Sequence, residues 1–312
     1  MQRSFYYWKS VFRLDTPERA VLRSLTVSNL YIKLFEVVPN QQTAAPATLI
    51  QFKNSFPAGI NCIPVVFIAN DVFKRLDSLK FDSFAQHVSE LAEQICTNNH
   101  FRGISEIQID CDWTASDKEN YFYFLKRLHR QPFLNKKLLS VTIRLHQLKY
   151  KSLTGIPPVD KGLLMCYNMG DLRDPKTNNS IIEVAEAKKY ITHLKDYPLH
   201  LDVALPIFDW YVWFRKNRFK GLIHTEDITG GEYPPEKNLS FNKDTIWKGF
   251  TFAEGDCLRY EDSKVDVVVK MAKLLNDNID IENLNVVLYH LDATEIHKYS
   301  IHDMETIYCC FH

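Results

Sequence analysis

Two carboxylates in one short apolar segment are the residues of this sequence best suited to chemistry. Asp110 and Asp112 lie in residues 107–113, where alternating apolar and polar side chains predict a β-strand. Gln108, Asp110 and Asp112 then share one face, with about 7 Å between successive Cα atoms on it. Two carboxylates this close raise the pKa of one of them and can share a proton. Such a pair can orient and polarise a substrate.

Two other roles remain open for these carboxylates. In a structural role, Asp110 pairs with a buried cation, Lys33 or Arg144, and Asp112 caps the turn that follows. In a metal site, His146 joins the two carboxylates, since carboxylate and imidazole both bind divalent ions. The spacing does not demand a metal, and we predict neither a metal nor another cofactor.

The segments that must position this pair alternate between apolar, β-rich runs and helical patterns, which favours a parallel sheet with crossover helices. Eight strands with interleaved helices predict an α/β fold, a single (β/α)₈ TIM barrel. The carboxylates then approach the C-terminal end of the fourth strand, where the active sites of such barrels lie. The predicted strands are 30–37, 49–52, 63–68, 107–113, 139–146, 162–169, 201–208 and 285–291, and the helices are 81–97, 117–128, 180–193 and 263–275.

Two segments interrupt this regular pattern. We predict one domain over residues 1–312, with residues 1–27 as an N-terminal extension before the barrel. Residues 211–262 form an insertion after the seventh strand. Because this insertion is rich in Gly, Pro and polar residues, we expect loops and a small β-element over the barrel mouth.

Polar and aromatic side chains near the predicted strand ends are candidates for substrate binding. A Trp ring offers a large apolar face on which a sugar ring can stack; anchoring of the insertion is the alternative role for the two Trp residues. Ser180 and Glu183 have the spacing of a helix capping box. The candidates, besides Gln108, are Arg144, His146, Asp209, Trp210, Trp213, Tyr289 and His290.

Composition excludes several classes of function. Lys plus Arg and Asp plus Glu each number 38, so there is no electrostatic reason to expect a nucleic-acid partner. The seven Cys residues show no zinc-site or disulfide spacing. Nucleotide-binding, zinc-protease and serine-hydrolase motifs are missing. No stretch reaches the length of a transmembrane segment, and the first residues lack a signal-peptide pattern, so the protein is cytoplasmic or any export segment lies outside this chain.

Two short motifs resemble family 18 glycoside hydrolases. Residues 110–114, Asp-Cys-Asp-Trp-Thr, are similar to the end of that family's strand-four motif, Asp-x-x-Asp-x-Asp-x-Glu. Residues 165–168, Met-Cys-Tyr-Asn, are similar to its strand-six motif, Met-x-Tyr-Asp. The resemblance implies that Asp112 orients the substrate, that Asp110 lies beneath it, and that Tyr167 bonds the substrate carbonyl. Asn168 then belongs to the substrate site.

The chain departs from the family pattern where the family's chemistry is concentrated. The final Glu, which is the family's general acid, is replaced by Thr114, and a Thr hydroxyl cannot donate a proton at a useful pKa. The first Asp of the motif is replaced by Ile107, and the strand-six Asp by Asn168. Glu36, which ends the first predicted strand, is a candidate for a replacement acid.

The order of segments from Tyr7 and Trp8 to Asp292 more closely resembles uncharacterised TIM-barrel proteins of Bacteroides-type bacteria, which implies a location at the cell envelope. We therefore expect a carbohydrate-active barrel, either a divergent glycosidase or a degenerate protein that binds glycans. Its partner would be an oligosaccharide. The alternative is a non-catalytic barrel that binds a protein partner through the 211–262 insertion.

Overall fold

A closed ring of eight parallel strands forms the centre of the structure, a computed structural model that describes residues 1–41, 43–225, 228, 238–280 and 282–311. β1 pairs with β17 on one side and with β3 on the other, which closes the ring. The predicted (β/α)₈ barrel is thereby confirmed. Its strands are β1 (Gln2–Tyr7), β3 (Asn29–Asn40), β6 (Asn61–Ile68), β7 (Glu106–Asp110), β8 (Leu138–Arg144), β9 (Lys161–Met165), β10 (His200–Pro206) and β17 (Asn285–Tyr289).

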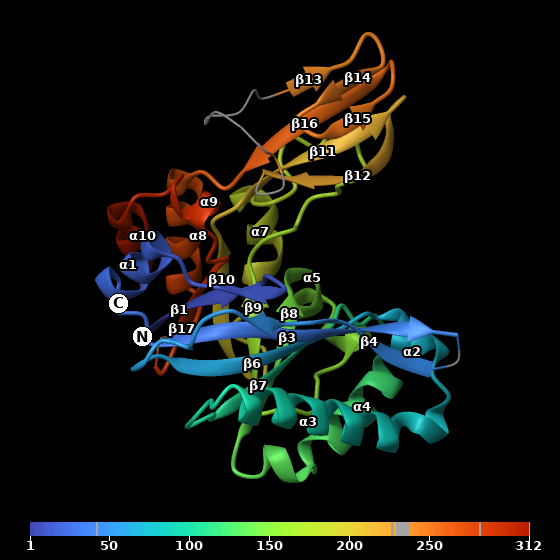
Figure 1. Cartoon of the computed structure of the whole chain (residues 1–312), viewed down its shortest axis with the longest axis vertical. Coiled ribbons are helices and arrows are strands. Elements are labelled where there is room, and N and C mark those ends of the chain that lie inside the picture. The colour runs from blue at the N-terminus through green and yellow to red at the C-terminus, as the bar shows by residue number, and fades with distance from the viewer. Residues whose placement is uncertain (42, 226–227, 229–237, 281, 312) are drawn as a thin grey trace.

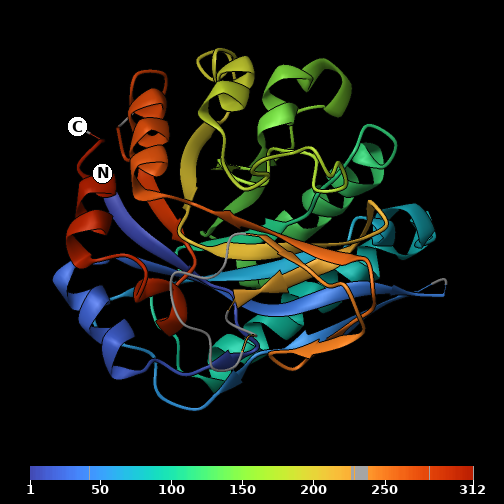
Figure 2. The ribbon, with the colours of Figure 1, turned by 90° about the horizontal axis from the view of Figure 1, so that it is seen from above.

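Helices surround this ring, and both termini lie on its outer side near β1 (Figures 1 and 2). α3 shows why they pack there, because it buries Phe84, Val88 and Ala92 on one helical stripe. No helix in the described part of the chain has the length and apolar character needed to cross a membrane. The helices are α1 (Thr16–Ser24), α2 (Asp71–Arg75), α3 (Phe81–Asn98), α4 (Lys118–His129), α5 (Leu145–Lys149), α6 (Lys151–Thr154), α7 (Val184–Ile191), α8 (Val265–Asn276), α9 (Ala293–Ile296) and α10 (Ile301–Tyr308), with 3₁₀ turns Ser78–Lys80 and Pro132–Leu134.

The first barrel strand corrects the sequence prediction. Residues 1–27 are not an extension outside the barrel, because β1 supplies one of its eight strands and α1 is the helix that follows it. Phe5 and Tyr7 are fully buried. The ring cannot close without β1, since it is the strand that joins β3 to β17.

The predicted second strand, residues 49–52, is also wrong. The chain from Thr43 to Leu49 forms β4, which returns antiparallel along β3. Two residues separate β3 from β4, and a connection that short joins antiparallel strands, not parallel ones. Gln51–Phe52 (β5) pairs with Val11–Phe12 (β2) outside the ring. The two errors cancel, so the strand that carries Asp110 is the fourth of the barrel, as predicted.

The insertion after the seventh barrel strand forms a small antiparallel sheet at one end of the barrel (Figure 1). It begins two residues before the predicted boundary. One face carries its own apolar cluster, in which Phe241 and Phe252 stack with ring centroids 4.4 Å apart. This small sheet consists of β11 (Asp209–Arg215), β12 (Arg218–His224), β13 (Asn238–Ser240) and β16 (Asp256–Asp262), while β14 (Thr245–Trp247) and β15 (Phe250–Phe252) form a separate two-stranded antiparallel sheet.

A buried lysine joins this small sheet to the barrel. Lys298, just after α9, lies 2.6 Å from the Asp209 carboxylate and 2.9 Å from the Glu295 carboxylate. These three side chains are at most 6% exposed. The Tyr260 hydroxyl, from β16, donates to Asp209 at 2.5 Å. Removing one member of such a buried pair leaves an uncompensated charge, which is costly.

We expect Lys298→Met to lower the free energy of unfolding by about 3–5 kcal/mol, because it leaves the Asp209 and Glu295 carboxylates buried without their cation. Chemical denaturation measures this loss. Lys270→Met is the matched control, since Lys270 pairs with Asp266 at the surface, and such pairs contribute less than about 1 kcal/mol. Equal effects of the two substitutions would contradict a stabilising role for the buried cluster.

Candidate functional site

A cavity of about 290 Å³ opens at the C-terminal ends of the barrel strands. We call it the inner cavity. β6, β7, β8, β9 and β17 contribute to its wall, and Trp210 and His224 of the small sheet border it as well. The register of the parallel strands brings these residues to the same height in the barrel. Asp110 of β7 lies beside Phe67 of β6, and Arg144 of β8 lies beside Met165 of β9. The barrel mouth and the small sheet therefore enclose one space.

Aromatic rings form a continuous arc around the inner cavity. Neighbouring ring centroids along it lie 5.1–6.3 Å apart, a separation typical of favourable aromatic pairs. The arc brings together residues from β6, from the end of β1, and from β17, β9, β10 and β11. Its members, in spatial order, are Phe67, Trp8, Tyr289, Tyr167, Phe208 and Trp210.

Asp110 lines the same cavity and is only 4% exposed. Thr142, on the adjacent strand β8, donates its hydroxyl to the Asp110 carboxylate at 2.7 Å. The pKa of Asp110 is raised to about 6, mainly by burial and also by the neighbouring Asp112 carboxylate, while the Arg144 and Lys33 cations and the Thr142 hydrogen bond oppose the rise. The group therefore titrates near neutral pH, as the sequence predicted for one carboxylate of the pair.

Arg144 pairs with Asp112, not with Asp110. Its guanidinium meets the Asp112 carboxylate with two N–H groups, Nε to Oδ1 and Nη2 to Oδ2, the latter at 3.0 Å. Burial alone would lower the pKa of Arg144, but the Asp112 carboxylate holds it above its usual value. The structural alternative in which Asp110 pairs with Arg144 is therefore wrong, and so is pairing with Lys33, which bonds Glu36. Glu36 is thus engaged as a partner of Lys33.

A second cavity of about 440 Å³, here called the outer cavity, shares Arg144, Tyr167 and Asn168 with the inner one. Asp112 and His146 line it as well. His146 does not end a strand as predicted: β8 stops at Arg144, and His146 lies in the first turn of α5. Burial and the Arg144 guanidinium lower the pKa of His146. The imidazole is therefore neutral at physiological pH.

Thr114 also lines the outer cavity but has a local structural role. Its hydroxyl donates to the Asp117 carboxylate at 2.7 Å, and its backbone N–H donates to the same carboxylate at 2.8 Å. Asp117, and not Asp112, therefore bonds the turn before α4. No carboxylic acid stands at the position that the resemblance assigned to the general acid.

Tyr167 lies between the two cavities and carries a hydroxyl without a partner. The side chain is 2% exposed, and no group in the described ranges hydrogen-bonds the hydroxyl oxygen. Burial raises the pKa of Tyr167 well above its usual value. A buried hydroxyl of this kind costs free energy until a partner reaches it. Of the predicted binding residues, Tyr289, His290, Asn168 and Trp210 also border the inner cavity.

Three predicted binding residues border neither mouth cavity. Gln108 lies deeper in the barrel, where it accepts from the Tyr6 hydroxyl. Asp209 is held by Lys298 in the buried cluster. Trp213 packs against Phe252 on the far face of the small sheet, with ring centroids 5.1 Å apart. Side-chain alternation places Trp210 and Trp213 on opposite faces of β11.

Sequence reasoning missed several cavity residues, Trp8 foremost. Trp8 follows β1 directly and joins Phe67 to Tyr289 in the aromatic arc. The signal was present in the aromatic run 5–8, which has strand propensity. Once residues 2–7 are recognised as a barrel strand, Trp8 falls at its C-terminal end. Lys9, next to it, also borders the cavity and pairs with Glu18 and Asp292.

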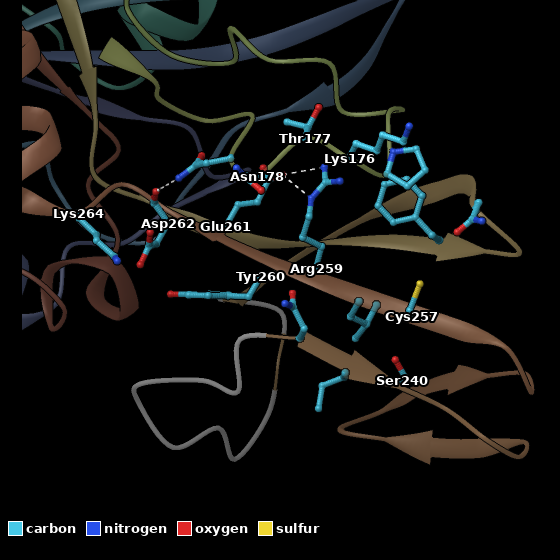
Figure 3. A pocket seen from close by; sticks show the side chains of 17 residues that line it. Lys176, Thr177, Asn178, Ser240, Cys257, Arg259, Tyr260, Glu261, Asp262 and Lys264 are labelled. Carbon is cyan, nitrogen blue, oxygen red and sulfur yellow. Dashed lines mark hydrogen bonds and ion pairs between the residues drawn. The ribbon is translucent and has the colours of Figure 1, made fainter. Parts of the chain in front are cut away.

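A third hollow, an open groove of about 800 Å³, lies along β16 and the loop 175–179 (Figure 3). Glu261 forms part of its wall and is 1% exposed. Its carboxylate pairs with Arg259 and accepts from Trp210 Nε1 at 2.9 Å. Ser180 donates to Glu261 as well, and α7 begins at Val184, so the predicted helix cap at Ser180 is wrong. Glu261 therefore fixes the Trp210 ring at the edge of the inner cavity.

The described residues contain no group of three or more His, Cys, Asp or Glu side chains placed to hold a metal ion. Asp110, Asp112 and His146 therefore do not form the metal site considered from sequence. All seven Cys residues are free thiols, and burial raises the pKa of Cys111 and Cys166, which follow the ends of β7 and β9. Asp110, Arg144 and Tyr167 line the inner cavity, and Asp112 lines the outer one.

No protein-family model matches the sequence, and no curated protein matches it either. The fold has solved relatives. It is the fold of chitinase-like TIM barrels. The spore cortex-lytic enzyme SleL from Bacillus cereus is 13% identical with a TM-score of 0.57, covering 100% of this chain and 74% of that one. A chitinase from Chromobacterium violaceum is 13% identical with a TM-score of 0.54, covering 98% of each chain.

A class V chitinase from Nicotiana tobaccum is also similar, at 12% identity and a TM-score of 0.52 over 97% of each chain. The structural neighbours are thus barrels like those of family 18 glycoside hydrolases. At such low identities the similarity concerns the fold. What this chain does must be argued from its own mouth residues.

We expect Asp110→Asn to stabilise the fold at pH 7.5 and to have little effect at pH 4. The folded-state pKa of about 6 exceeds the usual 3.8, so the folded protein holds this proton more tightly. Ionisation of Asp110 therefore lowers the free energy of unfolding above about pH 6, and this destabilisation vanishes as the pH falls below about 4. One pKa unit corresponds to about 1.4 kcal/mol, so the expected gain at pH 7.5 is roughly 2–3 kcal/mol.

Denaturant titrations of both proteins at the two pH values measure this gain. Asn keeps an oxygen that can accept from Thr142, so the substitution removes the charge and preserves the shape. A gain that is the same at pH 4 and pH 7.5 would show that ionisation of Asp110 is not its cause.

Proposed function

We propose that the protein binds a glycan at the barrel mouth, with one sugar ring in the inner cavity. The aromatic arc carries this proposal. Six rings surround a space that also contains carboxylate, amide and hydroxyl groups. Sugar rings present apolar C–H faces and polar edges, and ligand pockets combine apolar walls with a few placed polar groups. The chitinases and the cortex-lytic enzyme that share the fold have names that refer to the same class of ligand.

Tyr167 supplies a specific polar contact for this ligand. Its buried hydroxyl has no protein partner in the described ranges, and Tyr167 borders both the inner and the outer cavity. A sugar hydroxyl or carbonyl that reaches it would satisfy a group that is costly to leave unpaired. This is the role that the family 18 resemblance implied for Tyr167.

We propose further that the substrate-assisted hydrolysis of family 18 is lost. The position of its acid holds Thr114, which bonds Asp117. The position of its orienting carboxylate holds Asp112, which is bound by two N–H groups of Arg144. The mouth keeps one carboxyl with a pKa near neutrality, that of Asp110. Any remaining hydrolysis should therefore depend on Asp110.

The direct test incubates the purified protein with a mixture of oligosaccharides, N-acetylated ones included, and follows binding by calorimetry and products by mass spectrometry. We expect binding without cleavage. Cleavage that disappears in Asp110→Asn would identify a divergent hydrolase. A panel that yields neither binding nor cleavage would contradict glycan binding and favour the protein-interaction alternative at the insertion.

We expect Tyr167→Phe to weaken glycan binding about 3- to 10-fold, since one hydrogen bond contributes about 0.5–1.5 kcal/mol. The fold should be as stable as before or more stable, because the substitution removes a buried unpaired hydroxyl. Isothermal titration calorimetry and thermal unfolding measure the two effects.

Tyr121→Phe is the matched control for this experiment. Tyr121 is fully buried, and its hydroxyl also has no hydrogen-bond partner in the described ranges, but it lies in α4 and borders neither mouth cavity. The same atom is removed away from the proposed site. Equal loss of glycan affinity in both variants would argue against a contact between Tyr167 and the ligand.

A further inference from the structure

The cations of the barrel mouth are already paired with carboxylates. Lys9 lies 2.6 Å from Asp292 and 2.9 Å from Glu18. Lys33 bonds Glu36, and Arg144 is held by Asp112. Three cations are thus paired with four carboxylates, and Asp110 belongs to none of these pairs. Lys9 and Arg144, two of the paired cations, border the inner cavity together with Asp110.

Asp110 is the carboxylate left without a cation of its own. Among the described residues its hydrogen-bond partner is the neutral Thr142 hydroxyl. The residue is 4% exposed and lines the inner cavity. A buried carboxylate without a counter-ion is costly. A ligand that brings a positive charge to this point would remove that cost.

The aromatic arc favours the same kind of ligand group. The negative faces of Trp and Tyr rings attract cations, with energies of about 0.5–2 kcal/mol. The mouth already shows such a contact, because the Lys33 ammonium lies 5.0 Å from the centroid of the Trp8 ring. Trp8, Tyr167 and Tyr289 border the cavity together with Asp110. A small ammonium group could therefore meet a carboxylate and aromatic faces at once.

We propose that the inner cavity selects a sugar carrying a free, protonated amino group, and that Asp110 is the residue that determines this specificity. The proposal rests on the proposed glycan binding and adds the chemical class of the sugar. An N-acetylated sugar has a neutral amide in place of the ammonium and cannot neutralise Asp110. De-N-acetylated glycans are thus preferred over their N-acetylated counterparts.

The pH dependence of this preference has a definite sign. Amine binding strengthens as the pH rises through about 6, where Asp110 loses its proton. It weakens again when the amine itself loses its proton, near pH 8 for an amine like an α-amino group. His290, His224 and Tyr167 border the same cavity, so the curve must be compared with that of Asp110→Asn. Loss of the rise near pH 6 in this variant assigns it to Asp110.

The test measures, by calorimetry at pH 7, the affinity of the full chain for two ligands: the pentasaccharide of glucosamine and that of N-acetylglucosamine. We expect the glucosamine chain to bind at least about 10-fold more tightly, a difference of about 1.4 kcal/mol. Asp110→Asn should abolish this preference, which is measured as the ratio of the two affinities in the same variant. The Asn side chain keeps the shape of the cavity floor.

Glu183→Gln is the matched control. Glu183 is exposed, precedes α7 and borders neither mouth cavity, so this variant removes one negative charge without touching the site. It should keep the preference for glucosamine. An equal loss of preference in Glu183→Gln would reduce the effect to general charge attraction and overturn the role of Asp110.

Two further outcomes separate this inference from the proposed function. Binding of the N-acetylated chain with no preference for the amine would overturn the specificity proposal and leave glycan binding intact. Binding of neither chain, nor of the wider oligosaccharide mixture, would overturn both. Methylammonium chloride serves as a probe for the charge alone. At pH 7 it should compete with the glucosamine chain for binding to the native protein. In Asp110→Asn it should not compete with the N-acetylated chain.

Discussion

The ion pair between Arg144 and Asp112 decides the character of the barrel mouth. Arg144 ends β8, beside the strand that carries Asp110, and its guanidinium could have neutralised either carboxylate. It meets Asp112 through two N–H groups, a geometry that matches the planar guanidinium to a carboxylate. Asp112 is thereby committed to a protein partner, whereas within the described part of the chain Asp110 accepts a hydrogen bond from the Thr142 hydroxyl. The proposed preference for an amino sugar and the proposed loss of family-type catalysis both depend on this pairing.

Parallel register then determines what surrounds Asp110. Residues at equal heights on neighbouring strands present their side chains to the same space, which brings Phe67, Arg144, Met165 and Tyr289 to one level of the mouth. The small sheet contributes Trp210, which Glu261 fixes by a hydrogen bond. The Lys298 cluster in turn ties this sheet to the chain after β17. Buried charge thus holds the wall of the cavity in place.

Much of this architecture was predictable because it depends on periodicity. Alternation along residues 107–113 placed Asp110 correctly, and the eight-strand count identified the barrel. The count was right for a wrong reason, since β1 was overlooked and residues 49–52, which lie outside the ring, were counted as a barrel strand. Hydrophobic pattern alone does not distinguish a short edge run from a barrel strand. The difference lies in long-range pairing: β1 bonds β17, more than 270 residues away along the chain.

The sequence could not predict which carboxylate pairs with which cation. The sequence does not distinguish Asp110 from Asp112 as the partner of Arg144, because both are aspartates on the same predicted strand face. The choice is made by the pairing of β7 with β8 and by the end of β7 at Asp110. Beyond that residue the chain leaves the sheet, so Asp112 turns outward to Arg144 while Asp110 stays under the aromatic arc. Asp110 and Asp112 have identical side chains, but the end of β7 places them in different surroundings. Asp112 pairs with Arg144 at the rim, whereas Asp110 lines the inner cavity, where we propose that it meets the charged group of a ligand.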